Sequence, residues 1–274
     1  MASTPARAVA GYLRKYPFAP RYRHGQQLSL RAADGVRLAA VRLEGPPDAP
    51  ATVVLVHGFV NWSRTPRIHQ FAQRLAQRVH VVVPDLRGHG RSSGLGTMGI
   101  KEPMDVEAAV EAAKAAHPDL PVVTMGTSLG GAAALLHAGT MGGVAGVIAV
   151  SAPAFFVTDT HGTERIQRWV SGRTGRLVLA RLLRTRIART CDPVPDATDV
   201  VGRIAPAFTI VVHDPDDWYF GADHARILHG WARAPKALWW YPGVGHGTDL
   251  LTAALAGRVL AEVQMRLGSA GMVS

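Results

Sequence analysis

Residues 126–130 of this chain, GTSLG, place a serine between two glycines in a G-x-S-x-G pattern. An apolar run precedes the pattern, and an Ala- and Leu-rich segment with helical spacing follows it. Glycine lacks the Cβ atom that would collide in a sharp turn between a strand and a helix. A serine in such a turn exposes its hydroxyl, so the pattern predicts Ser128 as a nucleophile. The alternative interpretation is a serine that only caps the helix.

A serine hydroxyl becomes a good nucleophile only when a base removes its proton, so a histidine must lie nearby. Among the 12 histidines, His246 lies in a glycine-rich loop, residues 242–247, between the last predicted strand and the last predicted helix. The carboxyl ends of parallel strands meet at one edge of a sheet, which places this loop beside Ser128. The sequence therefore predicts His246 as the general base.

The base in turn needs a carboxylate that orients it and stabilises its protonated form. Three aspartates crowd the turn after the penultimate predicted strand, namely Asp214, Asp216 and Asp217. All three lie between the serine and the histidine in the chain. The residue types alone leave the choice among the three open.

The elements that must position these residues alternate between apolar runs and segments with helical spacing. Asp34-Gly35 between two extended runs predicts an antiparallel hairpin at the start. Six later runs are continuously apolar, as expected for strands covered on both faces: residues 52–57, 79–84, 122–126, 144–151, 208–213 and 238–241. Helical spacing occurs in residues 68–78, 106–117, 129–138, 224–232 and 248–267. This order predicts an α/β fold with a mostly parallel, doubly wound sheet.

Residues 154–203 interrupt the alternation, because they contain no clear strand. Between positions 164 and 189, eight arginines alternate with apolar residues, and Glu164 is the one acid. We expect a single domain over residues 1–274, in which residues 154–203 form a small helical cap that supplies most of the walls of the substrate pocket. The cap arginines either extend into solvent or attract anionic substrates or anionic lipid head groups.

Composition excludes several classes of protein. The 274 residues are 47% apolar and 18% charged, which excludes intrinsic disorder. No run approaches the ~20 apolar residues of a transmembrane helix. The net charge of +10 comes from residues 1–45, at +6, and residues 151–192, at +5, while the rest of the chain sums to −1. No nucleic-acid-binding motif accompanies this charge, so we expect no nucleic-acid partner.

The sequence also bears on compartment and cofactors. A single cysteine, Cys191, cannot form an internal disulfide, and the first residues carry no apolar segment of a secretory signal. We therefore predict a cytoplasmic protein. Residues 88–90 (GHG) lack the third glycine of a dinucleotide-binding loop, and the chain contains neither a P-loop nor a zinc-binding motif. We expect neither a cofactor nor a metal ion.

From the first parallel strand to the last helix, the sequence resembles the α/β-hydrolase family. In that family the penultimate strand commonly ends in an H-G-x-x-D pattern. His213 and Asp217 match this pattern here, while Asp214 stands in place of the glycine. The resemblance implies that Asp217 is the acid, and the departure at position 214 leaves Asp216 as the alternative.

Two further segments carry the same resemblance. Residues 57–59 (HGF) resemble the oxyanion loop of the family. This implies that the backbone N–H groups of Phe59 and Leu129 stabilise the oxyanion of a tetrahedral intermediate. Residues 85–92 (DLRGHGRS) resemble the family's D-x-R-G-x-G-x-S loop, which we interpret as structural support for the oxyanion loop.

The resemblance implies the α/β-hydrolase fold and a serine hydrolase. We expect Ser128, His246 and Asp217 to cleave a small-molecule carboxylic ester through an acyl-enzyme. A thioesterase, an amidase or a peptidase would use the same residues, since the fold alone does not select the reaction. Two alternatives are not enzymes: a non-catalytic α/β-hydrolase scaffold that binds a ligand, and a peripheral membrane protein that uses the basic cap.

Overall fold

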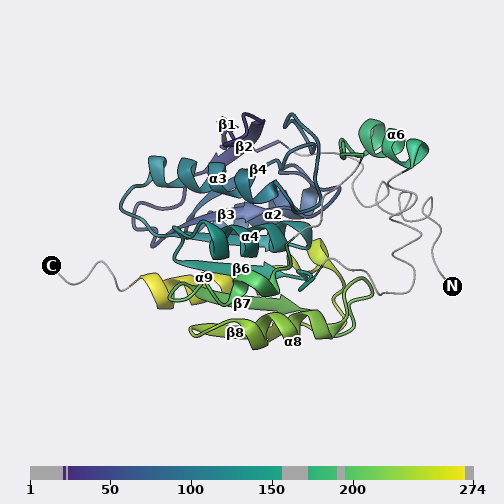
Figure 1. The fold of residues 1–274 in the computed structure, drawn as a ribbon. Helices are drawn as coiled ribbons and strands as arrows, with labels where there is room; N and C mark the ends of the chain where they lie inside the picture. The colour runs from purple at the N-terminus through teal and green to yellow at the C-terminus, as the bar shows by residue number, and fades with distance from the viewer. Residues whose placement is uncertain (1–20, 23, 156–171, 190–194, 269–274) are drawn as a thin grey trace.

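The computed structural model describes residues 21–22, 24–155, 172–189 and 195–268, and eight strands form one sheet (Figure 1). The strand order is β1-β2-β4-β3-β5-β6-β7-β8. β1 (Gln26–Arg31) pairs antiparallel with β2 (Arg37–Leu43), and β2 pairs antiparallel with β4 (His80–Pro84). All other neighbouring strands are parallel: β3 (Thr52–Val56), β5 (Val122–Thr127), β6 (Gly146–Val150), β7 (Phe208–His213) and β8 (Lys236–Trp240). The predicted sheet and its antiparallel lead-in are confirmed.

Helices cover both faces of this sheet. α2 (Pro66–Leu75) and α9 (Ala253–Leu267) pack on one face. The other face is covered by four helices: α3 (Glu102–Ala116), α4 (Leu129–Thr140), α7 (Thr198–Val201) and α8 (Ala222–Trp231). Every residue of β3, β4, β5, β6 and β7 is consequently buried, which is why these strands are continuously apolar rather than alternating.

The last predicted helix is divided in two. A short 3-10 turn, η1 (Gly247–Leu250), precedes α9, which begins at Ala253. Thr252 separates them, because its side chain accepts a hydrogen bond from Leu255 N–H and caps α9. Leu250 and Leu251, which precede α9, are buried like the apolar residues of the helix itself. The apolar pattern therefore gave no sign of the break between η1 and α9.

The predicted insertion at residues 154–203 is described only in part. Residues 156–171 and 190–194 lie outside the described residues, and with them Cys191 and the first arginines of the insertion. α6 (Arg173–Leu182) lies apart from the helix and sheet layers (Figure 1). α7, by contrast, packs between α4 and α8, so this end of the predicted insertion is part of the scaffold rather than of a cap. No helix within the described part of the chain combines the length and hydrophobicity needed to cross a bilayer.

Candidate active site

Ser128 occupies the sharp turn between β5 and α4. Its backbone has φ 51° and ψ −119°, a left-handed conformation that residues with side chains rarely adopt. Ser128 N–H donates to the carbonyl of Val150 at 2.8 Å, and Ala132 N–H donates to the carbonyl of Ser128 at 3.0 Å. These bonds hold the serine at the edge of the sheet where the parallel strands end, as the G-x-S-x-G pattern predicts.

Two glycines allow the backbone to form this turn without a steric clash. A Cβ atom on Gly126 would lie 2.1 Å from the carbonyl oxygen of Gly130. A Cβ atom on Gly130 would lie 2.4 Å from the carbonyl oxygen of His57. Both positions contact backbone atoms that cannot rotate away, so the turn excludes even a methyl group at either glycine.

We expect Gly126→Ala to lower the free energy of unfolding by about 3 kcal/mol, because the added methyl group overpacks the turn. Gly257→Ala is the matched control, since Gly257 is exposed within α9 and a Cβ there meets no atom within 4 Å. The control should raise stability by about 0.5–1 kcal/mol through the higher helix propensity of alanine. Urea denaturation of both variants measures the difference, and equal stabilities would contradict the steric argument.

His246 lies between Ser128 and Asp217. Its Nε2 atom is 3.0 Å from Ser128 Oγ, and its Nδ1 atom is 2.7 Å from Asp217 Oδ2. In the tautomer that fits both contacts, the serine hydroxyl donates to Nε2 and Nδ1–H donates to the carboxylate. The glycines on each side have φ 115° at Gly245 and 58° at Gly247, which a residue with a side chain would adopt only under strain.

Asp217 is the aspartate that contacts His246. Its other oxygen, Oδ1, accepts hydrogen bonds from Tyr219 N–H at 2.8 Å and Phe220 N–H at 3.2 Å. Burial of Asp217 by itself raises its pKa, but these bonds and His246 outweigh that effect and lower the pKa below its ordinary value. Asp216, the alternative acid, is exposed to solvent instead.

Two residues that support the site have roles that the sequence did not reveal. Asp214, which stands where the family pattern has a glycine, accepts hydrogen bonds from Gly243 N–H at 3.1 Å and Gly245 N–H at 2.6 Å. It therefore holds the loop that carries His246. His213 is fully buried, and its Nε2–H donates to the carbonyl of Phe220 at 2.8 Å, which braces the turn that carries Asp217.

The predicted oxyanion residues lie on both sides of the serine. A Cβ on Gly58 would lie 3.3 Å from Ser128 Cβ, so the loop that leads to Phe59 lies against Ser128. Leu129 is the first residue of α4, where the backbone N–H has no partner within the helix. Gly58, the neighbour of Phe59, therefore lies close to Ser128, and Leu129 follows Ser128 directly, while the function of Phe59 and Leu129 as oxyanion donors stays a prediction.

His57 holds the oxyanion loop in place. Its Nδ1–H donates to the carbonyl of Gly58 at 2.8 Å, and its Nε2 accepts a hydrogen bond from Leu86 N–H at 2.9 Å. Burial lowers the pKa of His57 to about 3, so the ring is neutral and can both donate and accept. Leu86 belongs to the loop of residues 85–92, as expected if that loop supports the oxyanion loop.

The same loop of residues 85–92 is anchored at Arg87. This buried guanidinium lies 2.7 Å from Asp34 in the turn of the hairpin and 2.7 Å from Asp105 in α3. Asp85 accepts hydrogen bonds from Ser63 N–H at 2.8 Å and from Arg91 N–H at 3.0 Å. The loop therefore ties the hairpin and α3 to the segment that follows the oxyanion loop.

The described part of the insertion lies against the oxyanion loop. Leu179, Leu183 and Ile187 form a small apolar cluster that packs on Phe59 and Val60. Backbone hydrogen bonds join the segment after α6 to the supporting loop: Gly90 N–H donates to Arg184 O at 3.0 Å, and Arg186 N–H donates to Gly88 O at 2.7 Å. A segment without regular strands is thus fixed beside the site.

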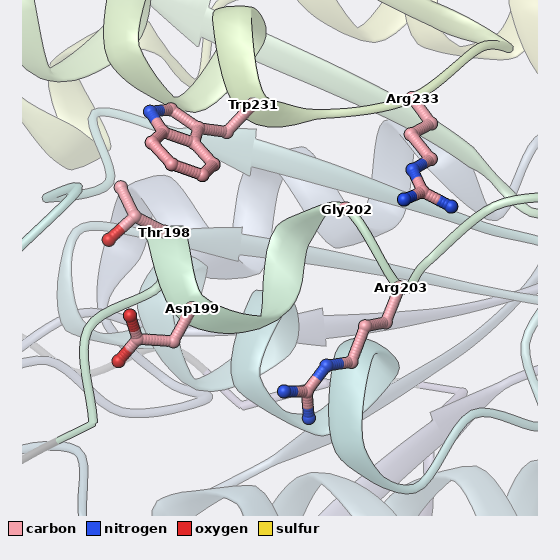
Figure 2. A pocket seen from close by; sticks show the side chains of 6 residues that line it. All are labelled: Thr198, Asp199, Gly202, Arg203, Trp231 and Arg233. Carbon is pink, nitrogen blue, oxygen red and sulfur yellow. The ribbon is translucent and has the colours of Figure 1, made fainter.

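A separate surface pocket lies between α7 and the end of α8 (Figure 2). Its lining residues are Thr198, Asp199, Gly202, Arg203, Trp231 and Arg233. Trp231 ends α8, a helix of 10 residues that begins shortly after Asp217. Such a helix is about 15 Å long, so the pocket is remote from Ser128, and it contains no histidine that could act as a base.

The sheet, its two helix layers and a serine in the turn after β5 define the chain as an α/β hydrolase. The family model described as serine aminopeptidase, S33, matches residues 47–200. The chain belongs to this family of hydrolases. No curated protein has a sequence that matches it.

Solved structures share the fold at low sequence identity. The Pyrococcus furiosus esterase Pf2001 superposes with a TM-score of 0.69 at 17% identity, over 89% of this chain and 92% of that one. The α/β hydrolase GrgF from Penicillium sp. sh18 gives a TM-score of 0.70 at 17% identity, over 89% and 99%. A thermophilic esterase from Thermogutta terrifontis, with malate bound, gives 0.68 at 18% identity, over 88% and 99%. These similarities confirm the predicted fold.

Proposed function

We propose that this hydrolase cleaves carboxylic esters, with Ser128 as nucleophile, His246 as general base and Asp217 as the acid that orients it. The observation that carries the proposal is the continuous chain of contacts from Ser128 Oγ through His246 to the Asp217 carboxylate. Esterases among the proteins of similar fold support the choice of substrate.

The geometry suits a two-step acyl transfer. Ser128 Oγ attacks the ester carbonyl carbon while His246 Nε2 takes the hydroxyl proton, and Asp217 stabilises the resulting imidazolium. Backbone N–H groups of Phe59 and Leu129 bind the oxyanion, and losing one such donor typically costs ~3 kcal/mol of barrier. His246 then protonates the leaving alcohol. A water molecule, deprotonated by His246, then attacks the acyl carbon. The bond from that carbon to Ser128 Oγ breaks, His246 returns the proton to Oγ, and the carboxylic acid leaves.

The family description favours peptide-bond hydrolysis as the second candidate. An aminopeptidase must bind the positively charged amino terminus of its substrate. Close to the oxyanion loop, however, the guanidinium groups of Arg64 and Arg184 each lie 5.4 Å from the ring of Trp62. Burial together with the nearby cations, including Arg91 and Arg184, lowers the pKa of Arg64. A cationic region beside the loop disfavours a substrate ammonium group, and it favours a neutral or anionic ester.

Labelling followed by a substrate panel tests this proposal. We expect a fluorophosphonate probe to label Ser128 at one site per chain. We also expect faster hydrolysis of p-nitrophenyl butyrate than of a butyryl thioester or an aminoacyl p-nitroanilide. An ester whose acyl chain ends in a carboxylate should be accepted, because the arginines attract it. Absence of labelling in folded protein would instead support a non-catalytic scaffold, and faster anilide hydrolysis would support an aminopeptidase.

A further inference from the structure

Three side chains with metal-ligating atoms meet at the edge of the sheet opposite Ser128. Glu44 follows β2, His80 begins β4 and His117 follows α3. β4 is oriented parallel to the strands that end at the catalytic edge, so its first residue lies about 16 Å from that edge. We name Glu44, His80 and His117 the edge cluster.

The edge cluster gathers its ligand atoms around one carboxylate oxygen. Glu44 Oε2 lies 2.9 Å from His80 Nδ1 and 3.0 Å from His117 Nε2. The two imidazole rings are stacked, with centroids 3.7 Å apart and planes inclined by 22°. All three ligand atoms lie within 4.8 Å of one another. Zinc binds such atoms at ~2.0–2.2 Å, so a small rotation of the side chains encloses one ion.

His80 Nδ1 has two neighbours, Gly45 N–H and Glu44 Oε2. In the tautomer of His80 whose Nδ1 carries no proton, Gly45 N–H donates to this nitrogen at 3.1 Å. Metal binding requires this form of the ring, with a free lone pair on Nδ1. In this tautomer Glu44 Oε2 faces an unprotonated nitrogen at 2.9 Å, and a cation bound between them would be a ligand partner for both atoms.

The surroundings of the cluster suit an ion that enters from solvent. The Glu44 side chain is 50% exposed, His117 21% and His80 9%. Arg42 Nε lies 2.7 Å from Glu44 Oε1, which turns the second oxygen, Oε2, towards the imidazoles. Water can complete the coordination on the exposed side. The positive charge of Arg42 weakens cation binding, so we expect moderate rather than tight affinity.

We propose that the edge cluster binds one divalent transition-metal ion, Zn²⁺ by preference, through Glu44 Oε2, His80 Nδ1 and His117 Nε2. Two imidazoles and a carboxylate are a common zinc ligand set. The ion takes the lone pair of His80 that Gly45 N–H now shares, and it ties the end of β2 to the start of β4 and the end of α3. Sequence motifs did not reveal this site, because the three ligands belong to three separate segments of the chain.

Calorimetric titration of tag-free, EDTA-treated protein with ZnCl₂ tests the proposal. We expect one Zn²⁺ per chain with saturable binding at pH 7.5. His117→Ala should raise the Kd for zinc at least about tenfold. Co²⁺ should produce a d–d absorption band in the wild type that weakens in this variant.

The controls separate this site from other histidines and from the proposed function. His229→Ala removes a histidine from the last turn of α8 and should leave zinc binding unchanged. Glu44→Gln removes the charge but preserves the shape, and it should weaken binding like His117→Ala. Ester hydrolysis by metal-free variants should remain at the wild-type rate, because the cluster lies at the other edge of the sheet. Equal zinc affinities in wild type and His117→Ala, or no saturable binding in the wild type, would overturn the proposal.

Discussion

Replacing Ser128 with alanine should lower kcat for a short p-nitrophenyl ester by roughly 10⁴-fold or more. The hydroxyl is the only atom of this side chain that can form the acyl-enzyme, and it lies 3.0 Å from His246 Nε2. The variant should keep a small residual activity. In it, a water molecule attacks the bound ester directly, and substrate binding and the oxyanion donors still assist that attack. Steady-state kinetics with purified protein measure the loss, and a fluorophosphonate probe should no longer label the variant.

Ser29→Ala is the matched control for this substitution. Ser29 lies exposed on β1, the outer strand of the sheet, and its loss should leave kcat unchanged. Alanine at position 128 experiences about the same backbone strain as serine, so the melting temperature should stay close to that of the wild type. If Ser128→Ala hydrolysed the ester at the wild-type rate, the proposed mechanism would be wrong, and another residue would have to be the nucleophile.

The sequence predicted the elements wherever burial on both faces imposed a simple pattern. The runs that form β3 to β7 are apolar at nearly every position, because helices cover both sides of the sheet. The turn at Ser128 was predictable for a similar reason, since only glycine tolerates the backbone contacts at positions 126 and 130. These signals are local, and each depends on one short stretch of chain.

Features that depend on distant segments could not be predicted in this way. In the sequence, Asp214 is only a departure from the family pattern. Its role depends on hydrogen bonds from Gly243 and Gly245, which lie about 30 residues later in the chain. His57 was part of a loop motif, but its bond to Leu86 appears only when two loops meet. The sequence of α7 does not distinguish a cap helix from a helix that covers the sheet. Its packing between α4 and α8 makes that distinction.

Replacing Asp217 with asparagine should lower kcat for the same ester by roughly 10³- to 10⁴-fold. The amide matches the carboxylate in shape but carries no negative charge, so it stabilises neither the imidazolium nor the tautomer in which Nε2 accepts the serine proton. Since Asp217 is buried, solvent screens its charge only weakly, and the loss of that charge is felt in full by His246. KM should change little, because the acid does not contact the substrate directly.

Asp216→Asn is the control, and it separates the two aspartates that the sequence left open. Asp216 is exposed, so removing its charge should change kcat by less than about threefold, the scale of a screened surface charge. A large loss in Asp216→Asn together with a small one in Asp217→Asn would reverse the assignment and show that the turn rearranges when substrate binds. Small losses in both would place the orienting carboxylate elsewhere. The two side chains carry the same charge and are neighbours in the same turn, so the expected asymmetry depends on the burial of Asp217 and on its contact with His246.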